Sequence, residues 1–465
     1  MQSGQNKIYF PRGHKKLKSF FDFSVLTIHE NGKKLTFLSI FIPKLCELLF
    51  AKLIGTVNTL MISNYAENAV GATTSATQIV TISSLLVNII TVGCTIIISI
   101  ELGRGDREQA ARITGTGFIT VTAISIMISI LIFGLAEPFL RMINLEGDAL
   151  AHGVTYLKIR GGLLFLSSIS GYLGTVLICN GKALAVMISG IISNTLNALF
   201  VFLLLYVKII PGISGTAAVA VATEIAVIAA IIYAAVVIFS LKLPIKMCFE
   251  GRYIKKIYGL GVPGSFASLS YNLAITLVVG FIGAIGIVSL NAYSFINTII
   301  SYVCITSAVV ASCVSVFIGR YAGRGDITSI KNFLRIAISI AVLANGTLSL
   351  LAFIFRNKIL SLFTVNEEIF KIAMTVLAID FIIECFRGVI NVLETSFNAS
   401  RDVITTFAAG VTTSWGILVP VSYIFGVTLG FGLAGCWIGM AASEVAKATV
   451  YIIHYKRGKW IKKIK

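Results

Sequence analysis

Twelve long apolar stretches dominate this 465-residue chain and leave it few ways to fold. A helix needs about 20 apolar residues to cross a bilayer, and each stretch reaches that length. The gaps between them are short, so the chain has no room for a sizeable soluble domain. We therefore predict an all-α membrane protein with twelve transmembrane helices, at residues 36–63, 70–102, 112–135, 151–179, 184–207, 213–240, 258–284, 290–320, 331–355, 370–399, 405–427 and 433–455.

Composition agrees with a membrane protein and excludes other classes. Hydrophobic residues make up 57% of the chain and charged residues 12%, whereas a soluble domain is about a quarter charged. The eight cysteines form no C-x-x-C motif and the four histidines are scattered, so we predict no metal site and no disulfide scaffold. The sequence has no P-loop motif and no clustered histidines for lipid chemistry. We expect neither an enzyme nor a bound cofactor.

The net charge of +18 is explained by where the basic residues lie. Lys and Arg gather in the N-terminal segment, in the gaps after the second, sixth and eighth apolar stretches, and in the C-terminal tail. With twelve spans, all these segments fall on one side of the membrane, which the positive-inside rule assigns to the cytoplasm. We expect a multi-pass protein of the inner or plasma membrane, surrounded by lipid, with both termini cytoplasmic and no nucleic-acid partner.

The chain also repeats itself at a constant offset of 220 residues. Gly103-Arg-Gly-Asp106 recurs as Gly323-Arg-Gly-Asp326, and the same offset pairs Pro43 with Pro263. Six helices separate equivalent points, so the halves share one orientation and their pseudo-twofold axis lies along the membrane normal. Two six-helix lobes that rock about a central cleft predict a secondary transporter, with a channel as an alternative.

This repeat sets the expected organisation of the chain. It consists of a cytoplasmic N-terminal segment, an N-lobe, a cytoplasmic linker, a C-lobe and a basic cytoplasmic tail, at residues 1–35, 36–240, 241–257, 258–455 and 456–465. Within the first Gly-Arg-Gly-Asp sequence, Asp106 and Gln109 have the spacing of an N-cap and its third helical residue. Gly103 and Gly105 are expected to permit a tight turn.

Several of these features together resemble the MATE (multidrug and toxic compound extrusion) family of transporters. The resemblance rests on Pro43 and 57–63, the two Gly-Arg-Gly-Asp turns, Asn194-Thr-Leu-Asn197, 212–218, 259–263 and 432–437. It implies a twelve-helix fold in two lobes that exports organic, often cationic, compounds driven by H⁺ or Na⁺ entry. Family members often carry an Asp where this chain has Asn58, and some carry a Glu shortly after the proline that corresponds to Pro263, where 264–272 has none.

Charged residues inside apolar spans are costly unless they face protein or water, so each is a candidate for function. In the first span, Lys44 and Glu47 are three residues apart and can pair on one helix face. Glu47 is either a carrier of the coupling ion or half of a structural pair. Lys52 and Asn58 lie further along the same span, and Asn58 serves either the site or helix packing.

The tenth span is the most heavily charged. Asp380, Glu384 and Arg387 fall on one stripe, and Glu394 follows two turns later. Two carboxylates around one cation give the balance that a protonation switch needs, although a structural ion pair is an equal alternative. Glu224 and Glu444 occupy equivalent positions of the two halves, which favours a shared packing role. The remaining candidates are polar residues that can line a cavity, namely Asn194, Asn197, Asn291 and Tyr293.

The sequence therefore predicts a functional monomer that exchanges small organic substrates for H⁺ or Na⁺. The alternative within the same superfamily is a lipid-linked oligosaccharide flippase, which would often have fourteen spans and a more cationic central cavity.

Overall fold

The computed structural model describes residues 22–30, 33–65, 67–142, 146–210, 215–361 and 366–464. The first half consists of α2 (Phe37–Tyr65), α3 (Glu67–Arg104), α4 (Arg107–Arg141), α5 (Gly147–Gly162), α6 (Leu164–Cys179), α7 (Ala183–Phe202) with its π-helical continuation η2 (Leu203–Val207), and α8 (Gly215–Ser240). The second half consists of α9 (Gly251–Ile285), α10 (Ile287–Arg324), α11 (Ile327–Ile354), the short α12 (Arg356–Ser361), α13 (Glu367–Ala399), α14 (Val403–Thr413), η3 (Ser414–Leu418), α15 (Val419–Ser422), η4 (Tyr423–Thr428) and α16 (Gly432–Arg457).

These helices account for the twelve predicted spans. Within the described residues, nine helices are long and apolar enough to cross a membrane, and α5 with α6 form one more span that bends by 44°. The other two are α2 and α13, with 29 and 33 residues. Each carries at least three charged residues through its middle, which lowers its hydropathy but not its length. The prediction of an all-α protein with twelve membrane helices is confirmed.

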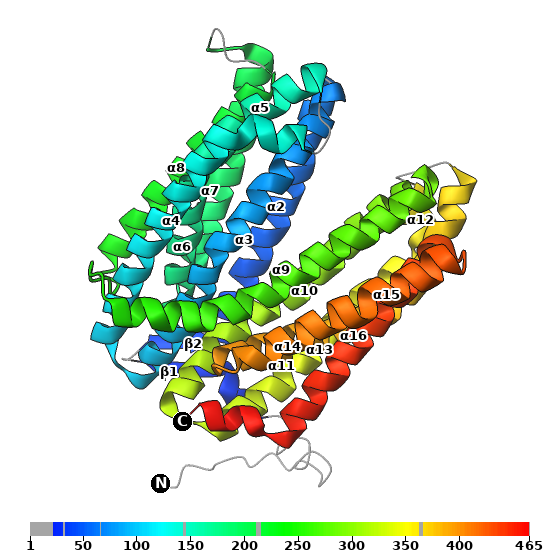
Figure 1. Cartoon of the computed structure of the whole chain (residues 1–465). Coiled ribbons are helices and arrows are strands. Elements are labelled where there is room, and N and C mark those ends of the chain that lie inside the picture. Colours follow the sequence, from blue (N-terminus) through cyan, green and yellow to red (C-terminus); the bar gives the residue numbers. More distant parts are fainter. Residues whose placement is uncertain are drawn as a thin grey trace, which may run out of the picture.

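The two lobes form a V (Figure 1). Helices α2–α8 make one arm and α9–α16 make the other, and the arms converge where the C-terminus lies. At this narrow end α3 packs against α9 and α10, and α2 packs against α10. Because α4 begins beside this junction and α10 ends there, the end of α4 and the α9–α10 turn lie at the opposite, wide end.

Two glycines allow α3 and α10 to cross closely at the narrow end. A Cβ atom on Gly103 would lie 2.4 Å from the carbonyl oxygen of Arg320, and one on Gly323 would lie 2.1 Å from that of Ile100. Gly103 was expected to lie in the turn, but it is still part of α3, where it allows the close contact with α10. The turns themselves use Gly105 and Gly325, whose φ angles of 84° and 69° are left-handed.

The caps predicted after these turns are present. The Asp106 carboxylate accepts a hydrogen bond from the Gln109 backbone N–H at 2.8 Å and begins α4. Asp326 caps α11 in the same way through the Ser329 N–H at 3.0 Å. The repeated tetrapeptide therefore ends one helix, brings the lobes together and begins the next helix in each half.

A short β-hairpin within the N-terminal segment was not foreseen. A 3₁₀ turn η1 (Phe23–Leu26) leads into β1 (Thr27–Glu30) and β2 (Lys33–Thr36), which pair antiparallel. Val25 and Ile28 are buried in the cluster that contains Tyr321 and Phe333 of the C-lobe, and the Tyr321 hydroxyl donates to the Val25 carbonyl at 2.7 Å. On the other side, the Leu35 side chain lies against Gly181 of the α6–α7 turn, so the hairpin contacts both lobes.

The C-terminal end is anchored by a buried carboxylate. After α16, the 3₁₀ turn η5 (Lys459–Lys463) folds back so that Trp460 is fully buried. Asp402, in the α13–α14 turn, is 0% exposed. Its two oxygens contact Lys463 Nζ at 2.6 Å and His454 Nε2 at 2.7 Å.

Candidate substrate and ion site

The site begins with the close approach of α11 and α13. A Cβ atom on Gly388 would lie 3.1 Å from the backbone of Ala341, so the absence of a side chain there lets the two helices pack tightly. One turn further along, Asn345 of α11 donates to the carboxylate of Glu384 at 3.1 Å. Both side chains are fully buried, so the polar contact is made away from solvent.

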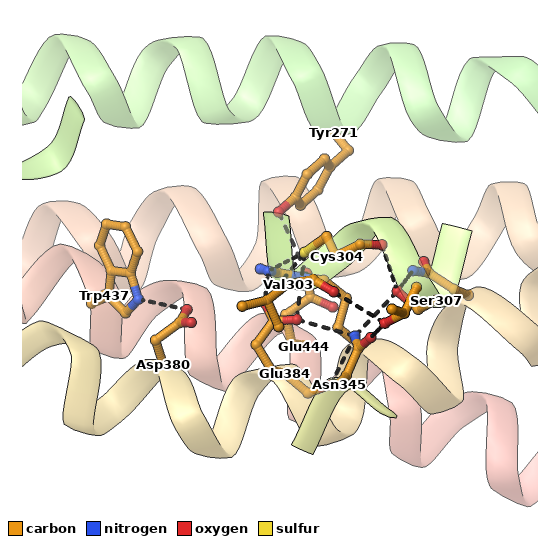
Figure 2. A network of polar contacts seen from close by, with 12 residues as sticks. Tyr271, Val303, Cys304, Ser307, Asn345, Asp380, Glu384, Trp437 and Glu444 are labelled. Atoms are coloured by element: carbon orange, nitrogen blue, oxygen red, sulfur yellow. Dashed lines mark hydrogen bonds and ion pairs between the residues drawn. The ribbon is translucent and has the colours of Figure 1, made fainter. Parts of the chain in front are cut away.

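Glu384 and Arg387 form the centre of a buried polar network (Figure 2). They make a direct ion pair on α13, as the i,i+3 spacing predicts. The Cys304 thiol of α10 lies 3.4 Å from both Glu384 oxygens. Ser307 extends the network, since its hydroxyl accepts hydrogen bonds from Asn345 at 3.1 Å and from Asn391 at 3.0 Å. Glu384 thus has partners on three helices.

Arg387 joins two carboxylates from different helices. Besides Glu384, its Nε lies 3.9 Å from a carboxylate oxygen of Glu444 on α16. The Tyr271 hydroxyl of α9 donates to the same Glu444 oxygen at 3.4 Å. The guanidinium group therefore sits between α13 and α16, where a change in the charge of either carboxylate alters the balance on the other.

Asp380 has a different partner from the one the sequence predicted. It was expected to share Arg387 with Glu384, but its carboxylate accepts a hydrogen bond from the Trp437 indole N–H at 3.2 Å. The reason is helical geometry, because seven residues of helix rise by about 10 Å and place Asp380 two turns from Arg387. Asp380 remains 2% exposed, so this carboxylate is buried beside the indole ring of Trp437.

Glu394 belongs to a neighbouring cluster. Lys447 of α16 pairs with it at 2.7 Å, and the Tyr451 hydroxyl donates to it at 3.0 Å. Together, the two clusters contain four carboxylates and two cations. The carboxylates are Asp380, Glu384, Glu394 and Glu444, and the cations are Arg387 and Lys447. When all are ionised, the C-lobe interior carries a formal excess of two negative charges.

These clusters border two connected cavities. The larger, of 740 Å³, is lined by the C-lobe side chains Tyr293, Asn297, Cys304, Arg387 and Trp437 and also by Gln78 of the N-lobe. The smaller, of 220 Å³, is lined by Asn391, Glu394, Glu444 and Lys447. Tyr271, Asn272 and Arg387 line both. The cation of the network, Arg387, therefore lines the larger cavity, which also contacts the N-lobe. The carboxylates Glu394 and Glu444 line the smaller cavity, whereas Asp380 and Glu384 lie behind these linings.

The N-lobe has a separate polar cavity of 270 Å³. Lys44, Glu47 and Asn194 line it, and the predicted Lys44–Glu47 pair is formed at 2.9 Å. Asn194 donates to the Gly190 carbonyl of its own helix at 2.8 Å. Asn197 is buried elsewhere in this lobe and donates to the Thr223 hydroxyl at 3.0 Å. The candidates of the two lobes therefore form two sites rather than one.

The equivalent glutamates show how the repeat has diverged. Glu224 pairs with Arg160 of α5, whereas Glu444 lies near Arg387 of α13. The position equivalent to Arg160 in the C-lobe is Asp380, 220 residues later. A basic residue in one lobe thus corresponds to an acidic residue in the other, and the acidic excess is confined to the C-lobe clusters described above.

Of the remaining candidates, Tyr293 lies beside the C-lobe site, Lys52 and Asn291 are exposed, and Asn58 cannot be placed. Lys52 is exposed on α2, with its ammonium 5.9 Å from the centre of the Tyr302 ring on α10. Asn291 is exposed near the start of α10, while Tyr293 contacts Trp437 edge to face at 5.9 Å. Asn58 belongs to α2, but its side chain falls outside the described residues. Among the described residues, no three His, Cys, Asp or Glu side chains form a metal cluster.

Sequence reasoning missed several members of the site. Lys447 was detectable, because it stands inside an apolar span three residues after Glu444. Asn345 was equally visible as a polar residue amid apolar neighbours. Tyr271, Cys304 and Trp437 carried no such signal, since aromatic residues and cysteine are common in any membrane helix. Only the packing of α10 and α16 on α13, and of α9 on α10 and α16, brings them together.

The two halves are matched separately by one family model. The MatE model aligns with residues 43–203 and again with residues 263–424, which together cover more than half of the chain. The chain belongs to the MatE family. Both matches start at the proline of a repeat, Pro43 or Pro263, so the match reproduces the 220-residue register.

Relatives along the full length agree with this MatE assignment. The chain is 27% identical over 426 residues to a Bacillus subtilis protein named uncharacterized transporter YisQ, covering 90% of this chain and 94% of the relative. It is 20% identical to a probable multidrug resistance protein, NorM, of Thermotoga maritima, covering 91% and 92%. A crystal structure of MATE in complex with MaD3S has the same fold, with a TM-score of 0.85 at 17% identity, covering 92% and 96%.

This MatE protein is therefore a multi-pass membrane transporter and not an enzyme. The comparisons do not favour the lipid-linked oligosaccharide flippase. In the described part of the chain there are twelve membrane helices, whereas such flippases were expected often to have fourteen.

Proposed function

We propose that this protein exports amphipathic organic cations from the cell in exchange for an inward-moving H⁺ or Na⁺. The observation that carries the proposal is the buried acidic network of the C-lobe. Its Arg387 lines the 740 Å³ cavity between the lobes, and its Glu444 lines the adjacent 220 Å³ cavity. Buried carboxylates in excess over their cations attract a positively charged ligand.

The shape of the cavity suits an organic cation. Its volume falls within the range of about 300–1,000 Å³ that is typical of small-molecule sites. Tyr271, Tyr293 and Trp437 supply aromatic faces and edges around it, and such faces bind desolvated cations with about 0.5–2 kcal/mol each. Relatives named as multidrug resistance proteins support this substrate class.

Coupling follows from competition for the same negative charge. A proton or Na⁺ that binds Glu384 or Glu444 removes part of the charge that holds the organic cation. The Arg387 guanidinium group would then pair more strongly with the other carboxylate, because it contacts both. Two ligands that exclude each other from one site, in a protein with two conformations, are the minimum that antiport requires.

The direction of transport follows from the orientation that we propose. The narrow end carries both Gly-Arg-Gly-Asp turns, the hairpin and the C-terminal tail, which are rich in Lys and Arg. The positive-inside rule places this end, and with it both termini, in the cytoplasm of a plasma-membrane protein. The wide end then faces outward, and rocking of the two lobes within a single chain would expose the cavity to each side in turn.

The proposal is tested by binding of ethidium, a fluorescent organic cation, to purified full-length protein. Titrations are made between about pH 5 and pH 9, with and without Na⁺. Glu384→Gln removes one carboxylate and is expected to weaken ethidium binding about tenfold, the equivalent of one charge-assisted contact. It should also remove much of the dependence of binding on pH or Na⁺. Glu444→Gln is expected to act in the same direction.

The matched control is Glu137→Gln, which neutralises an exposed glutamate paired with Arg141 far from the cavity. It should titrate like the unmodified protein. Unchanged titrations in both Glu384→Gln and Glu444→Gln would overturn the C-lobe site. Glu47→Gln would then be tested, because Glu47 lines the separate N-lobe cavity.

A further inference from the structure

Another polar cavity lies at the narrow end, away from the substrate site and from the N-lobe cavity. It has a volume of 210 Å³ and lies among segments of both lobes. Its lining includes five basic residues and no acidic residue, and the basic residues are Lys34, Arg107, Lys182, Lys242 and Arg320. A cavity of this size exceeds the volume of a water molecule, about 30 Å³, several times over.

Each of the five basic residues comes from a different segment. Lys34 belongs to β2 of the hairpin, Arg107 begins α4, and Lys182 stands in the α6–α7 turn. Lys242 follows α8, and Arg320 belongs to α10 of the C-lobe. Basic side chains from both lobes and from the hairpin that contacts both therefore line the same cavity.

Nearby basic residues show that acidic partners are available at this end. Arg104 pairs with Glu101 at 2.9 Å, and Arg112 pairs with Glu250 at 3.1 Å. In contrast, Lys34, Arg107, Lys182 and Lys242 make no side-chain ion pair or hydrogen bond within the described part of the chain.

Arg320 is the buried base of the cavity. It is 3% exposed and donates to the carbonyl oxygens of Ser99 at 3.2 Å and Cys179 at 2.7 Å. The carbonyl oxygens that Arg320 contacts carry no net charge. Lys182 is half-buried, and Lys34, Arg107 and Lys242 are exposed around the mouth of the cavity. Like charges gathered around one cavity repel one another, and an anion that binds among them would relieve this repulsion.

We propose that this cavity binds an anion that bears a phosphate group. Phosphate oxygens accept charge-assisted hydrogen bonds from Lys and Arg, which are about twice as strong as neutral ones. Because the cavity is lined by the N-lobe, the C-lobe and the hairpin, the bound phosphate bridges the lobes and stabilises the closed narrow end. The phosphate can belong to a lipid headgroup or to a soluble molecule such as pyrophosphate.

The experiment uses full-length protein purified in detergent and freed of anionic lipid. Inorganic pyrophosphate is added to one set of samples and short-chain phosphatidic acid to another, and the shift of the melting temperature gives each affinity. The double variant Lys182→Gln/Lys242→Gln is expected to bind the effective anion at least about tenfold more weakly, since two charge-assisted contacts are lost.

The matched control is Lys255→Gln/Lys256→Gln. It removes the same charge from exposed lysines of α9 outside the cavity and should leave the affinity unchanged. A response to pyrophosphate identifies a soluble anion, and a response to phosphatidic acid alone identifies a lipid headgroup. If neither anion shifts the melting temperature, or if both double variants lose equal affinity, the site is overturned.

This outcome is independent of the proposed antiport. Anion binding is measured without transport, and ethidium binding at the C-lobe site is expected to be equal in both double variants. A failure of the ethidium experiment would therefore leave the anion site standing, and the reverse also holds.

Discussion

A buried carboxylate needs partners that compensate for its loss of water, and Asp402 illustrates how this protein provides them. Burial opposes ionisation of Asp402, but hydrogen bonds from Lys463, His454 and Thr405 outweigh it and lower the pKa of this carboxyl below its ordinary value. The partners come from η5, α16 and α14. The single charge of Asp402 thereby fixes the C-terminal turn against the C-lobe.

Replacing this carboxylate is expected to destabilise the protein. Asp402→Asn leaves Lys463 and His454 without an anionic partner, and we expect a loss of about 2 kcal/mol of unfolding free energy. The pKa of Asp402 is lower in the folded than in the unfolded protein. The stabilisation that its ionised carboxylate gives the folded state is therefore fully present above the unfolded pKa of about 3.9 and is lost as pH falls through the folded pKa.

Thermal unfolding in detergent measures this difference. The gap in melting temperature between the two proteins should stay constant from about pH 8 to pH 5 and narrow below about pH 4. A gap that widens in acid, or no gap at pH 7, would contradict this account of Asp402.

At the scale of the elements, hydropathy located the membrane helices well, because burial in lipid depends on residue type rather than on tertiary contacts. It also located the charged helices α2 and α13, and the recurring Gly-Arg-Gly-Asp sequence located the 220-residue repeat. It could not locate the β1–β2 hairpin, which is stabilised by packing on α10 and α11, far away in the sequence. Nor could it show that Asp380 would contact Trp437, because that depends on how α16 lies against α13.

The helix crossing at the narrow end gives the next prediction. Gly103→Ala would place a Cβ atom 2.4 Å from the carbonyl oxygen of Arg320, so the backbones of α3 and α10 must separate. We expect a loss of about 1–3 kcal/mol of stability from overpacking, seen as a lower melting temperature. Gly280→Ala is the control, because nothing lies within 4 Å of its Cβ and alanine favours helix. Equal melting temperatures for the two variants would show that the crossing tolerates a side chain.

At the scale of the whole molecule, the lobes touch at one end and separate at the other, so contacts across the narrow end set the balance between conformations. One of them joins Glu101 of α3 to Arg401 of the α13–α14 turn at 3.8 Å. Glu101 is buried and also pairs with Arg104. Loss of this carboxylate weakens the closed narrow end and favours the opposite conformation.

Spin labels at the wide end can report this change. Met142→Cys and Ile287→Cys place labels on exposed residues, one per lobe, in a background without other cysteines. Glu101→Gln is expected to raise the population with a shorter label distance about two- to fivefold, as fits a partly exposed pair worth about 0.5–1 kcal/mol. Glu108→Gln is the control, because Glu108 pairs with Arg112 of its own helix and with Lys246 of the segment that follows α8, and neither partner belongs to the C-lobe. An unaltered distance distribution in Glu101→Gln would exclude this contact as a determinant of conformation.

The hairpin also has a consequence for biosynthesis. The hairpin and its η1 turn leave the ribosome before α2 and the helices that follow, yet the Val25 carbonyl accepts a hydrogen bond from Tyr321, 296 residues later. Val25 and Ile28 must wait until α10 and α11 have been inserted before they gain their apolar surroundings. Docking of the hairpin is therefore a late step of assembly. Because docking of the hairpin needs both lobes in place, a docked hairpin distinguishes a completed transporter from a chain that is still being synthesised.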